Sequence, residues 1–181
     1  RGSNFSASCA HAPKAAMSAS TSFSSSLTST AFVLTVTMPN LYLSPLLAAP
    51  EDIAAYLAAW TNHAIPGTGL NEATLLHYLH GPNWMVWLGT PAEDVPLPIG
   101  YAITCYDNDI RDLTYLAVMP FMQRRGYGRE MLRQLCAKYE DTKCIQLEVA
   151  RTNEAALKLY LSEGFSIVAS RESSLILQRP C

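Results

Sequence analysis

The chain has 181 residues, of which 49% are hydrophobic and 15% are charged, and its formal net charge is −2. These values are typical of one soluble globular domain, and the charge gives no general reason to expect nucleic acid or an acidic membrane as a partner. No apolar run reaches the roughly 18 residues of a membrane span. The five cysteines form no CxxC pair and are odd in number, which indicates a reduced, intracellular setting and not a disulfide framework.

Residues 1–37 differ in composition from the rest of the chain. The first part of this segment is rich in serine, alanine and threonine, and the chain has no acidic residue before Glu51. Such a composition cannot build a core, so we expect the segment to be disordered or additional to the fold. The alternatives are a cloning remnant, an upstream extension before a true start at Met38, and a transit peptide, although transit peptides usually contain more arginine. The predicted domain covers residues 38–181.

Strands and helices alternate from residue 41 onward. Apolar–polar alternation predicts the strands, and apolar residues at helical spacing predict the helices. Asn71 and Asn153 stand where helix N-caps are expected, and Gly164 stands at a helix end. This order predicts a mixed sheet with helices on its faces. The predicted strands are residues 41–46, 83–89, 98–107, 111–118, 144–149, 165–170 and 174–178, and the predicted helices are residues 50–60, 71–80, 128–140 and 153–164.

The segment PFMQRRGYGREML, residues 120–132, places two glycines at the start of a predicted helix. A strand, a glycine-rich loop and a helix N-terminus form an anion site, because backbone N–H groups point outward and glycine lets a ligand approach closely. Two phosphate-binding motifs do not fit, since GxGxxG would need glycine at Met131 and GxxxxGK[ST] is absent. A local cluster of arginines supports an anion site, with a solvated helix face as the alternative. The cluster is Arg124, Arg125, Arg129 and Arg133.

Residues 123–128, QRRGYG, follow the strand YLAVMP and resemble the pyrophosphate loop Q/R-x-x-G-x-G/A of the GNAT superfamily of acetyltransferases. A second segment, LEVARTNEAALKLYLSEGF at residues 147–165, resembles the later cofactor-binding and catalytic motif of the same superfamily. The resemblance covers most of residues 41–178, and both segments are most similar to the ribosomal-protein-alanine N-acetyltransferases. It implies an α/β (α+β) fold, with a mixed, mostly antiparallel seven-stranded sheet that is splayed between strands 4 and 5 and flanked by about four helices.

The resemblance also implies roles for individual residues. Glu148 would be the general base, acting directly or through water, and Tyr160 the general acid that protonates the departing thiolate. Backbone N–H groups of the fourth strand, freed by a bulge, would bind the pantetheine and the thioester carbonyl, and those of residues 124–129 would hold the pyrophosphate. Asn153 would contact the cofactor, cap its helix, or do both. The implied cofactor-binding residues are Leu116, Ala117, Val118, Arg124, Arg125, Gly126, Tyr127, Gly128, Arg129 and Asn153.

The implied reaction transfers acetyl from acetyl-CoA, a cosubstrate, to a primary amine. The first candidate acceptor is a protein N-terminal α-amine, whose pKa of about 7.7–8.0 needs less help from a base than the value of about 10.4 for lysine. A small amine or amino-acid-like metabolite is the second candidate, and a non-catalytic CoA-binding module is a third reading. No metal is expected, because His77 and His80 have no evident third ligand.

Two features bear on the acceptor and its setting. Residues 63–73, HAIPGTGLNEA, predict a flexible substrate loop. The turn at residues 171–173 is tight, whereas the ribosomal-protein branch carries a longer, tyrosine-containing segment there. We expect a cytoplasmic monomer or homodimer, or an organellar protein if residues 1–37 are a transit peptide.

Overall fold

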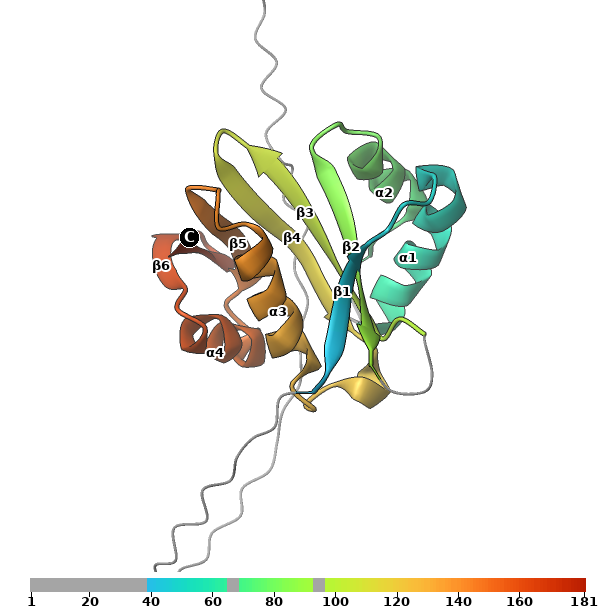
Figure 1. Cartoon of the computed structure of the whole chain (residues 1–181). Helices are drawn as coiled ribbons and strands as arrows, with labels where there is room; N and C mark the ends of the chain where they lie inside the picture. Colours follow the sequence, from blue (N-terminus) through green and yellow to red (C-terminus); the bar gives the residue numbers. More distant parts are fainter. Residues whose placement is uncertain (1–38, 65–68, 93–96) are drawn as a thin grey trace, which may run out of the picture.

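The computed structural model describes residues 39–64, 69–92 and 97–181 of the chain. The predicted extension over residues 1–37 lies outside these ranges, and so does the centre of the predicted substrate loop, residues 65–68. The described elements follow the predicted order (Figure 1). They are β1 (Leu41–Pro45), α1 (Pro50–Ala64), α2 (Glu72–Leu79), β2 (Trp84–Pro91), β3 (Gly100–Asp107), β4 (Ile110–Val118), the 3-10 helix η1 (Pro120–Met122), α3 (Tyr127–Lys138), β5 (Cys144–Ala150), α4 (Glu154–Ser162), β6 (Ser166–Ser170) and β7 (Ser174–Pro180).

The strands form one seven-stranded sheet in the order β1-β2-β3-β4-β5-β7-β6. Every neighbouring pair is antiparallel except β4 and β5, which are parallel. In the described chain this parallel pairing runs from Ile110 and Cys144 to Asp112 and Gln146. Both strands continue beyond that point without pairing to each other, which confirms the predicted mixed sheet with a splay between strands 4 and 5.

A bulge in β4 lies at the start of the splay, two residues after the last pair with β5. Ile103 of β3 pairs with Tyr115, but its neighbour Thr104 pairs with Leu113, so Thr114 is an extra residue in β4. An extra residue shifts the alternation of side chains by one position. As a result Leu113 packs in one core while Tyr115 packs in the other. The bulge therefore lies before Leu116 and Val118, two of the residues whose N–H groups it was expected to free.

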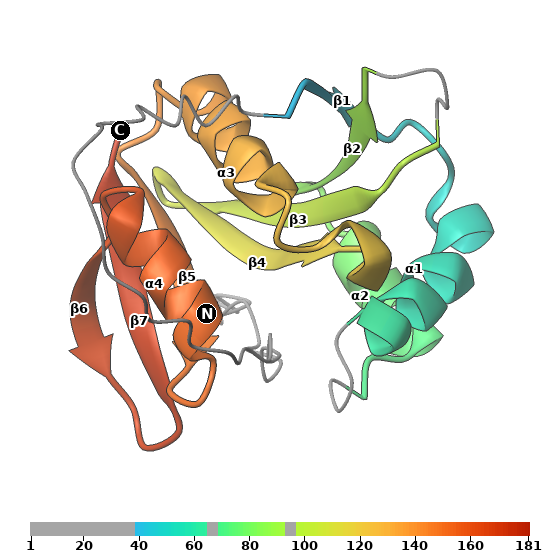
Figure 2. The ribbon, with the colours of Figure 1, turned by 90° about the horizontal axis from the view of Figure 1, so that it is seen from below.

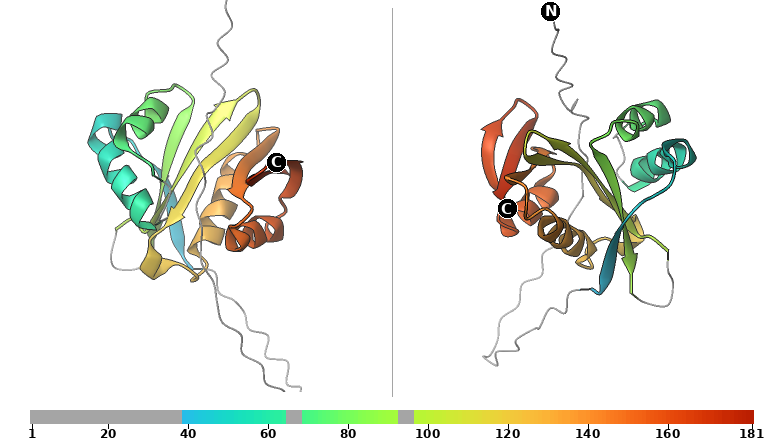
Figure 3. Two further views of the ribbon diagram at one scale, coloured as in Figure 1. Left: turned by 180° about the vertical axis from the view of Figure 1, so that it is seen from behind. Right: turned by 45° about the horizontal axis from the view of Figure 1, so that its top comes forward.

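Helices cover both faces of the sheet (Figure 2). α3 and α4 pack over one core, which contains Met131 and Ile145, and α1 and α2 pack over a second core, which contains Leu57 and Tyr101. α1 and α2 lie beside one end of the sheet, and α4 lies with β5, β6 and β7 at the other end (Figure 3). None of the helices in the described ranges is both long and apolar enough to span a bilayer.

The helix ends agree with their predicted signals. The Asn71 side chain accepts a hydrogen bond from the N–H of Thr74 at 2.8 Å, and thereby caps α2. Gly164 follows α4 with a φ of 88°, which is the left-handed conformation that glycine adopts most easily. α3 begins at Tyr127, one residue earlier than predicted, because Gly126 is its N-cap.

Candidate active site

A cavity of about 290 Å³ lies where β4 and β5 separate. Ligand-binding cavities usually measure about 300–1,000 Å³, so this one is close to the lower end of that range. Most of the predicted site residues line it. Arg125 instead is exposed, and Tyr127 packs into the core beneath α3. The predicted residues on the cavity wall are Leu116, Ala117, Val118, Arg124, Gly126, Gly128, Arg129, Glu148, Asn153 and Tyr160.

The register of β4 determines which of its backbone N–H groups face the cavity. The N–H of Met119 donates to the carbonyl of Ile99 at 2.8 Å, so odd-numbered residues at this end of β4 direct their N–H groups toward β3. Because these directions alternate along a strand, the N–H groups of Leu116 and Val118 point toward the splay. The N–H of Ala117 points toward β3. Of the three residues predicted to supply backbone donors, Leu116 and Val118 direct their N–H groups toward the splay, whereas Ala117 does not.

The glycine loop connects the end of β4 to α3. Gln123 donates from Nε2 to the carbonyl of Val118 at 2.9 Å, which ties the loop to the strand. Gly126 has a φ of 89°, and within the described chain no side chain caps the helix that begins after it. The first N–H groups of an α-helix have no acceptor within the helix, so they are available to a ligand. A Cβ on Gly128 would lie 3.7 Å from Cγ2 of Val118, which leaves ordinary van der Waals space.

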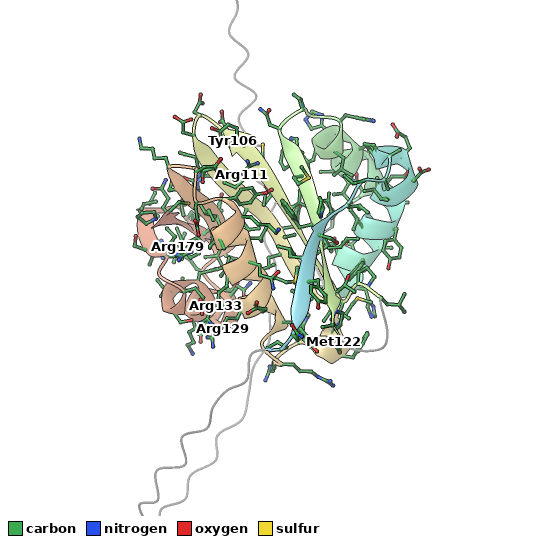
Figure 4. The ribbon with its side chains drawn as sticks, in the orientation of Figure 1. Tyr106, Arg111, Met122, Arg129, Arg133 and Arg179 are labelled. Atoms are coloured by element: carbon green, nitrogen blue, oxygen red, sulfur yellow. The ribbon has the colours of Figure 1, made fainter. Side chains whose placement is uncertain are left out.

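Two of the clustered arginines join α3 to the end of α4 (Figure 4). Arg129 Nε lies 2.9 Å from Glu163 Oε1, and its Nη2 donates to Ser162 Oγ at 3.1 Å. Arg133 Nε donates to Glu163 Oε2 at 2.7 Å. The carboxylate of Glu163 therefore forms ion pairs with both arginine side chains. Arg124 is exposed and lines the cavity.

Glu148 is buried in β5, with 9% of its surface exposed, and it lines the cavity. The hydroxyl of Ser174 donates to its Oε1. Arg171 Nη1 lies 3.3 Å from its Oε2. The neighbouring side chains of Leu147 and Val149 point into the core beneath α3, as the alternation of the strand predicted.

Tyr160 and Asn153 bring α4 to the same cavity. Tyr160 is half-buried, its ring lies 5.7 Å from that of Phe165, and burial raises its pKa to about 12. The Asn153 side chain accepts a hydrogen bond from the N–H of Ala156 at 3.1 Å, so it caps α4 as predicted. Its capping role does not exclude a ligand contact, because the same residue also lines the cavity.

The described part of the chain contains no group of three or more His, Cys, Asp or Glu side chains that would hold a metal ion. His80 forms an ion-pair contact of 2.6 Å with Glu51, which joins α2 to α1 at the surface.

A sequence profile of the Acetyltransferase (GNAT) family matches residues 49–165. The chain belongs to this family. The match confirms the family that the two motifs indicated, and it includes the glycine loop, β5 and the whole of α4. The matched range also includes the splayed part of β4 and the loop before α3.

Similar proteins include two alanine N-acetyltransferases of a ribosomal protein. The [ribosomal protein bS18]-alanine N-acetyltransferase of Salmonella typhimurium is 39% identical over 75 residues, which are 40% of this chain and 51% of that protein. The chain thus spans about half the length of this curated relative. The crystal structure of the ribosomal-protein-S18-alanine N-acetyltransferase from Escherichia coli has 27% identity and a TM-score of 0.62, and covers 77% of this chain and 93% of that one.

A third structure is similar in fold. The PaiA N-acetyltransferase of Thermoplasma acidophilum, in complex with coenzyme A, has 13% identity and a TM-score of 0.63. The match covers 77% of this chain and 99% of that one. At this identity the likeness extends to the fold alone.

Sequence reasoning did not single out Ser174 and Arg171, which lie next to the cavity wall at Glu148. Both contact Glu148, from positions in β7 and in the turn before it. The antiparallel pairing of β5 with β7 places Ser174 opposite Ala150. A register between strands that are distant in the chain has no local sequence signal. In the sequence, the turn at residues 171–173 is notable only for its short length.

Proposed function

We propose that this protein transfers an acetyl group from acetyl-CoA to a primary amine, and that the amine is the N-terminal α-amine of a protein. The observation that carries the proposal is that one cavity brings together the glycine loop, the splayed end of β4, Glu148 and Tyr160. Two similar proteins are named for the acetylation of alanine in a ribosomal protein, which supports the choice of acceptor.

The first turn of α3 is the proposed site of the pyrophosphate. Acetyl-CoA supplies a thioester, whose acetyl group is activated for attack by an amine. The N–H groups from Gly126 to Arg129 lie at a helix N-terminus, where unpaired donors and the helix dipole both favour an anion. Gly128 has no side chain to obstruct the approach, and Arg124 adds a positive charge at the wall of the cavity.

The N–H groups of Leu116 and Val118 are the proposed donors to the pantetheine and to the carbonyl oxygen of the thioester. They point toward the splay because the register with β3 uses the alternate residues. A donor aimed at an oxygen that gains negative charge is worth about 2.7–4 kcal/mol in a dry site. The backbone supplies these donors, so they need no reorganisation during the reaction.

Glu148 is the proposed acceptor of the proton that the amine loses, directly or through water. How strong a base is needed depends on the pKa of the acceptor amine. An α-amine has a pKa of about 7.7–8.0 and lysine one of about 10.4, so removing a proton from lysine costs about 3.5 kcal/mol more. This difference favours an α-amine as the acceptor.

Tyr160 is the proposed donor to the departing sulfur. Its pKa of about 12 keeps the phenol protonated at neutral pH. Complete transfer of this proton to a thiolate with a pKa of about 8.5 would cost about 5 kcal/mol. Tyr160 therefore acts first as a hydrogen-bond donor that stabilises the thiolate. The thiolate becomes a thiol by taking up one proton, and the amine loses one proton, so the reaction is balanced.

One observation favours the second candidate acceptor, an amino-acid-like metabolite. The turn between β6 and β7 is short, and Arg171 extends from it to the wall of the cavity at Glu148. Besides the Nη1 that contacts Glu148, this guanidinium has further N–H donors, and these match the carboxylate of a small acceptor. The peptide and the metabolite are therefore tested together.

The test measures consumption of acetyl-CoA with a panel of peptides and a panel of small amines. We expect turnover with peptide N-termini, and a loss of about 100-fold or more in kcat for Glu148→Gln and Tyr160→Phe. Acetyl-CoA affinity, measured by titration calorimetry, should remain near the wild-type value in both variants.

Other results would change the assignment. Turnover with small amines alone would establish the metabolite as the acceptor. Binding of acetyl-CoA without turnover on any amine would indicate a non-catalytic module. If the protein does not bind acetyl-CoA, the proposed function is wrong.

A further inference from the structure

We propose that Arg171 is a positioning residue for Glu148: its guanidinium, paired with the carboxylate, holds that carboxylate oriented toward the cavity. The proposal rests on the proposed function, in which Glu148 accepts the proton of the amine. It concerns a residue outside the two GNAT motifs, in the turn between β6 and β7.

The burial of Glu148 creates the need for a partner. Its side chain is 11% exposed, whereas that of Arg171 is 49% exposed. A buried carboxylate is strongly disfavoured unless a countercharge or hydrogen-bond donors compensate it. The hydroxyl of Ser174 donates a hydrogen bond to Oε1, and the guanidinium of Arg171 forms an ion pair with Oε2 at 3.3 Å. A guanidinium carries several N–H donors in a rigid plane, so it can hold a carboxylate in one orientation.

The turn that carries Arg171 is itself fixed. The N–H of Arg171 donates to the carbonyl of Ser174 at 2.9 Å, which closes the turn. Arg151, in the loop between β5 and α4, donates from Nε to the carbonyl of Arg171 at 3.1 Å and from its N–H to the carbonyl of Ser173 at 3.0 Å. Its Nη2 also donates to Ser170 Oγ. Figure 2 shows this turn beside the loop that joins β5 to α4.

The two arginines therefore have different roles. Arg151 directs its donors to oxygen atoms of the turn, so it holds the backbone in place. Arg171 directs its guanidinium to Glu148. The connection between β6 and β7 is short, and it brings the side chain of Arg171 to the carboxylate of Glu148. A long connection would not fix the position of this side chain.

The test compares Arg171→Ala and Arg171→Lys with the matched control Glu172→Ala, which changes the next residue in the turn, also exposed. We expect Arg171→Ala to lower kcat by about 10- to 100-fold, as for other small losses of alignment. The KM for acetyl-CoA should stay at the wild-type value, Arg171→Lys should recover part of the kcat, and Glu172→Ala should match the wild type. Millimolar guanidinium chloride should partly restore Arg171→Ala, but not the double variant Arg171→Ala, Glu148→Gln.

The outcomes separate this inference from the proposed function. Low kcat in Glu148→Gln with wild-type kcat in Arg171→Ala overturns the inference and leaves the function intact. The inference is also overturned if Arg171→Ala lowers kcat further in the Glu148→Gln background, because a residue that acts through Glu148 has no effect once Glu148 is changed. A lowered melting temperature without recovery by lysine or guanidinium would indicate a purely structural role. Wild-type kcat in Glu148→Gln would overturn the inference together with the role proposed for Glu148, and would leave acetyl transfer itself intact.

Discussion

Gly128→Ala should separate the stability of the α3 N-terminus from its ability to bind acetyl-CoA. Gly128 is the second residue of α3, and its φ is outside the left-handed region. An alanine Cβ would lie 3.7 Å from Cγ2 of Val118, so the protein itself has room for it. Alanine is favoured over glycine in a helix interior by about 0.8–1.0 kcal/mol, and by less in the first turn. The free energy of unfolding should therefore stay the same or rise by less than about 1 kcal/mol.

The same methyl group should weaken acetyl-CoA binding. Gly128 and Val118 both line the cavity, beside the backbone N–H groups proposed for the pyrophosphate. A methyl group forced into a close contact typically costs about 1–3 kcal/mol. This range corresponds to an increase of about 5- to 150-fold in the Kd for acetyl-CoA.

Gly126→Ala is the comparison for stability, because at this position the added methyl group should destabilise the protein itself. Gly126 has a φ of 89°, and a Cβ would lie 3.1 Å from Cδ of Pro39. The left-handed conformation alone costs a non-glycine residue about 1–2 kcal/mol. Gly126→Ala should therefore lower the free energy of unfolding by at least that amount.

Urea denaturation measures the stability of each variant, and titration calorimetry measures the Kd for acetyl-CoA. Wild-type affinity in a stable Gly128→Ala variant would refute the reasoning, because the N–H groups of α3 would then not face the pyrophosphate. A clear loss of stability in Gly128→Ala would contradict the local geometry instead.

Two further predictions concern α4. Asn153→Ala should lower the free energy of unfolding by about 1 kcal/mol through loss of the cap, whereas Asn153→Ser should keep the stability. If Asn153 also contacts acetyl-CoA, the serine variant should bind it more weakly in calorimetry, and unchanged affinity would leave capping as its one role. Tyr160 has a folded pKa of about 12 against an unfolded value of about 10, so its contribution to stability is complete below pH 10 and is lost as the pH rises through 12. In alkaline denaturation followed by circular dichroism, Tyr160→Phe should lose less stability than the wild type between pH 10 and 12, and an equal loss would contradict the raised pKa.

The order of elements, both asparagine caps and the loop at α3 were predictable because each depends on residues near one another in the chain. A helix cap such as Asn153 bonds to an N–H three residues later. The glycine loop and the helix that follows it are likewise contiguous, and the motif resemblance at residues 123–128 was confirmed at the level of the family. Most of the predicted site residues also line the same cavity.

The amino-acid sequence by itself determined the strands, the helices and the family of this protein, because periodicity, caps and motifs are local patterns. The tertiary structure alone decided the bulge at Thr114, and with it which N–H groups of β4 face the splay. It alone also placed Arg171 and Ser174 on Glu148, across 23 and 26 positions of the chain, and joined Arg133 to Glu163 across 30. These contacts depend on strand register and on helix packing, which arise from the burial of two whole cores and leave no pattern in any short segment.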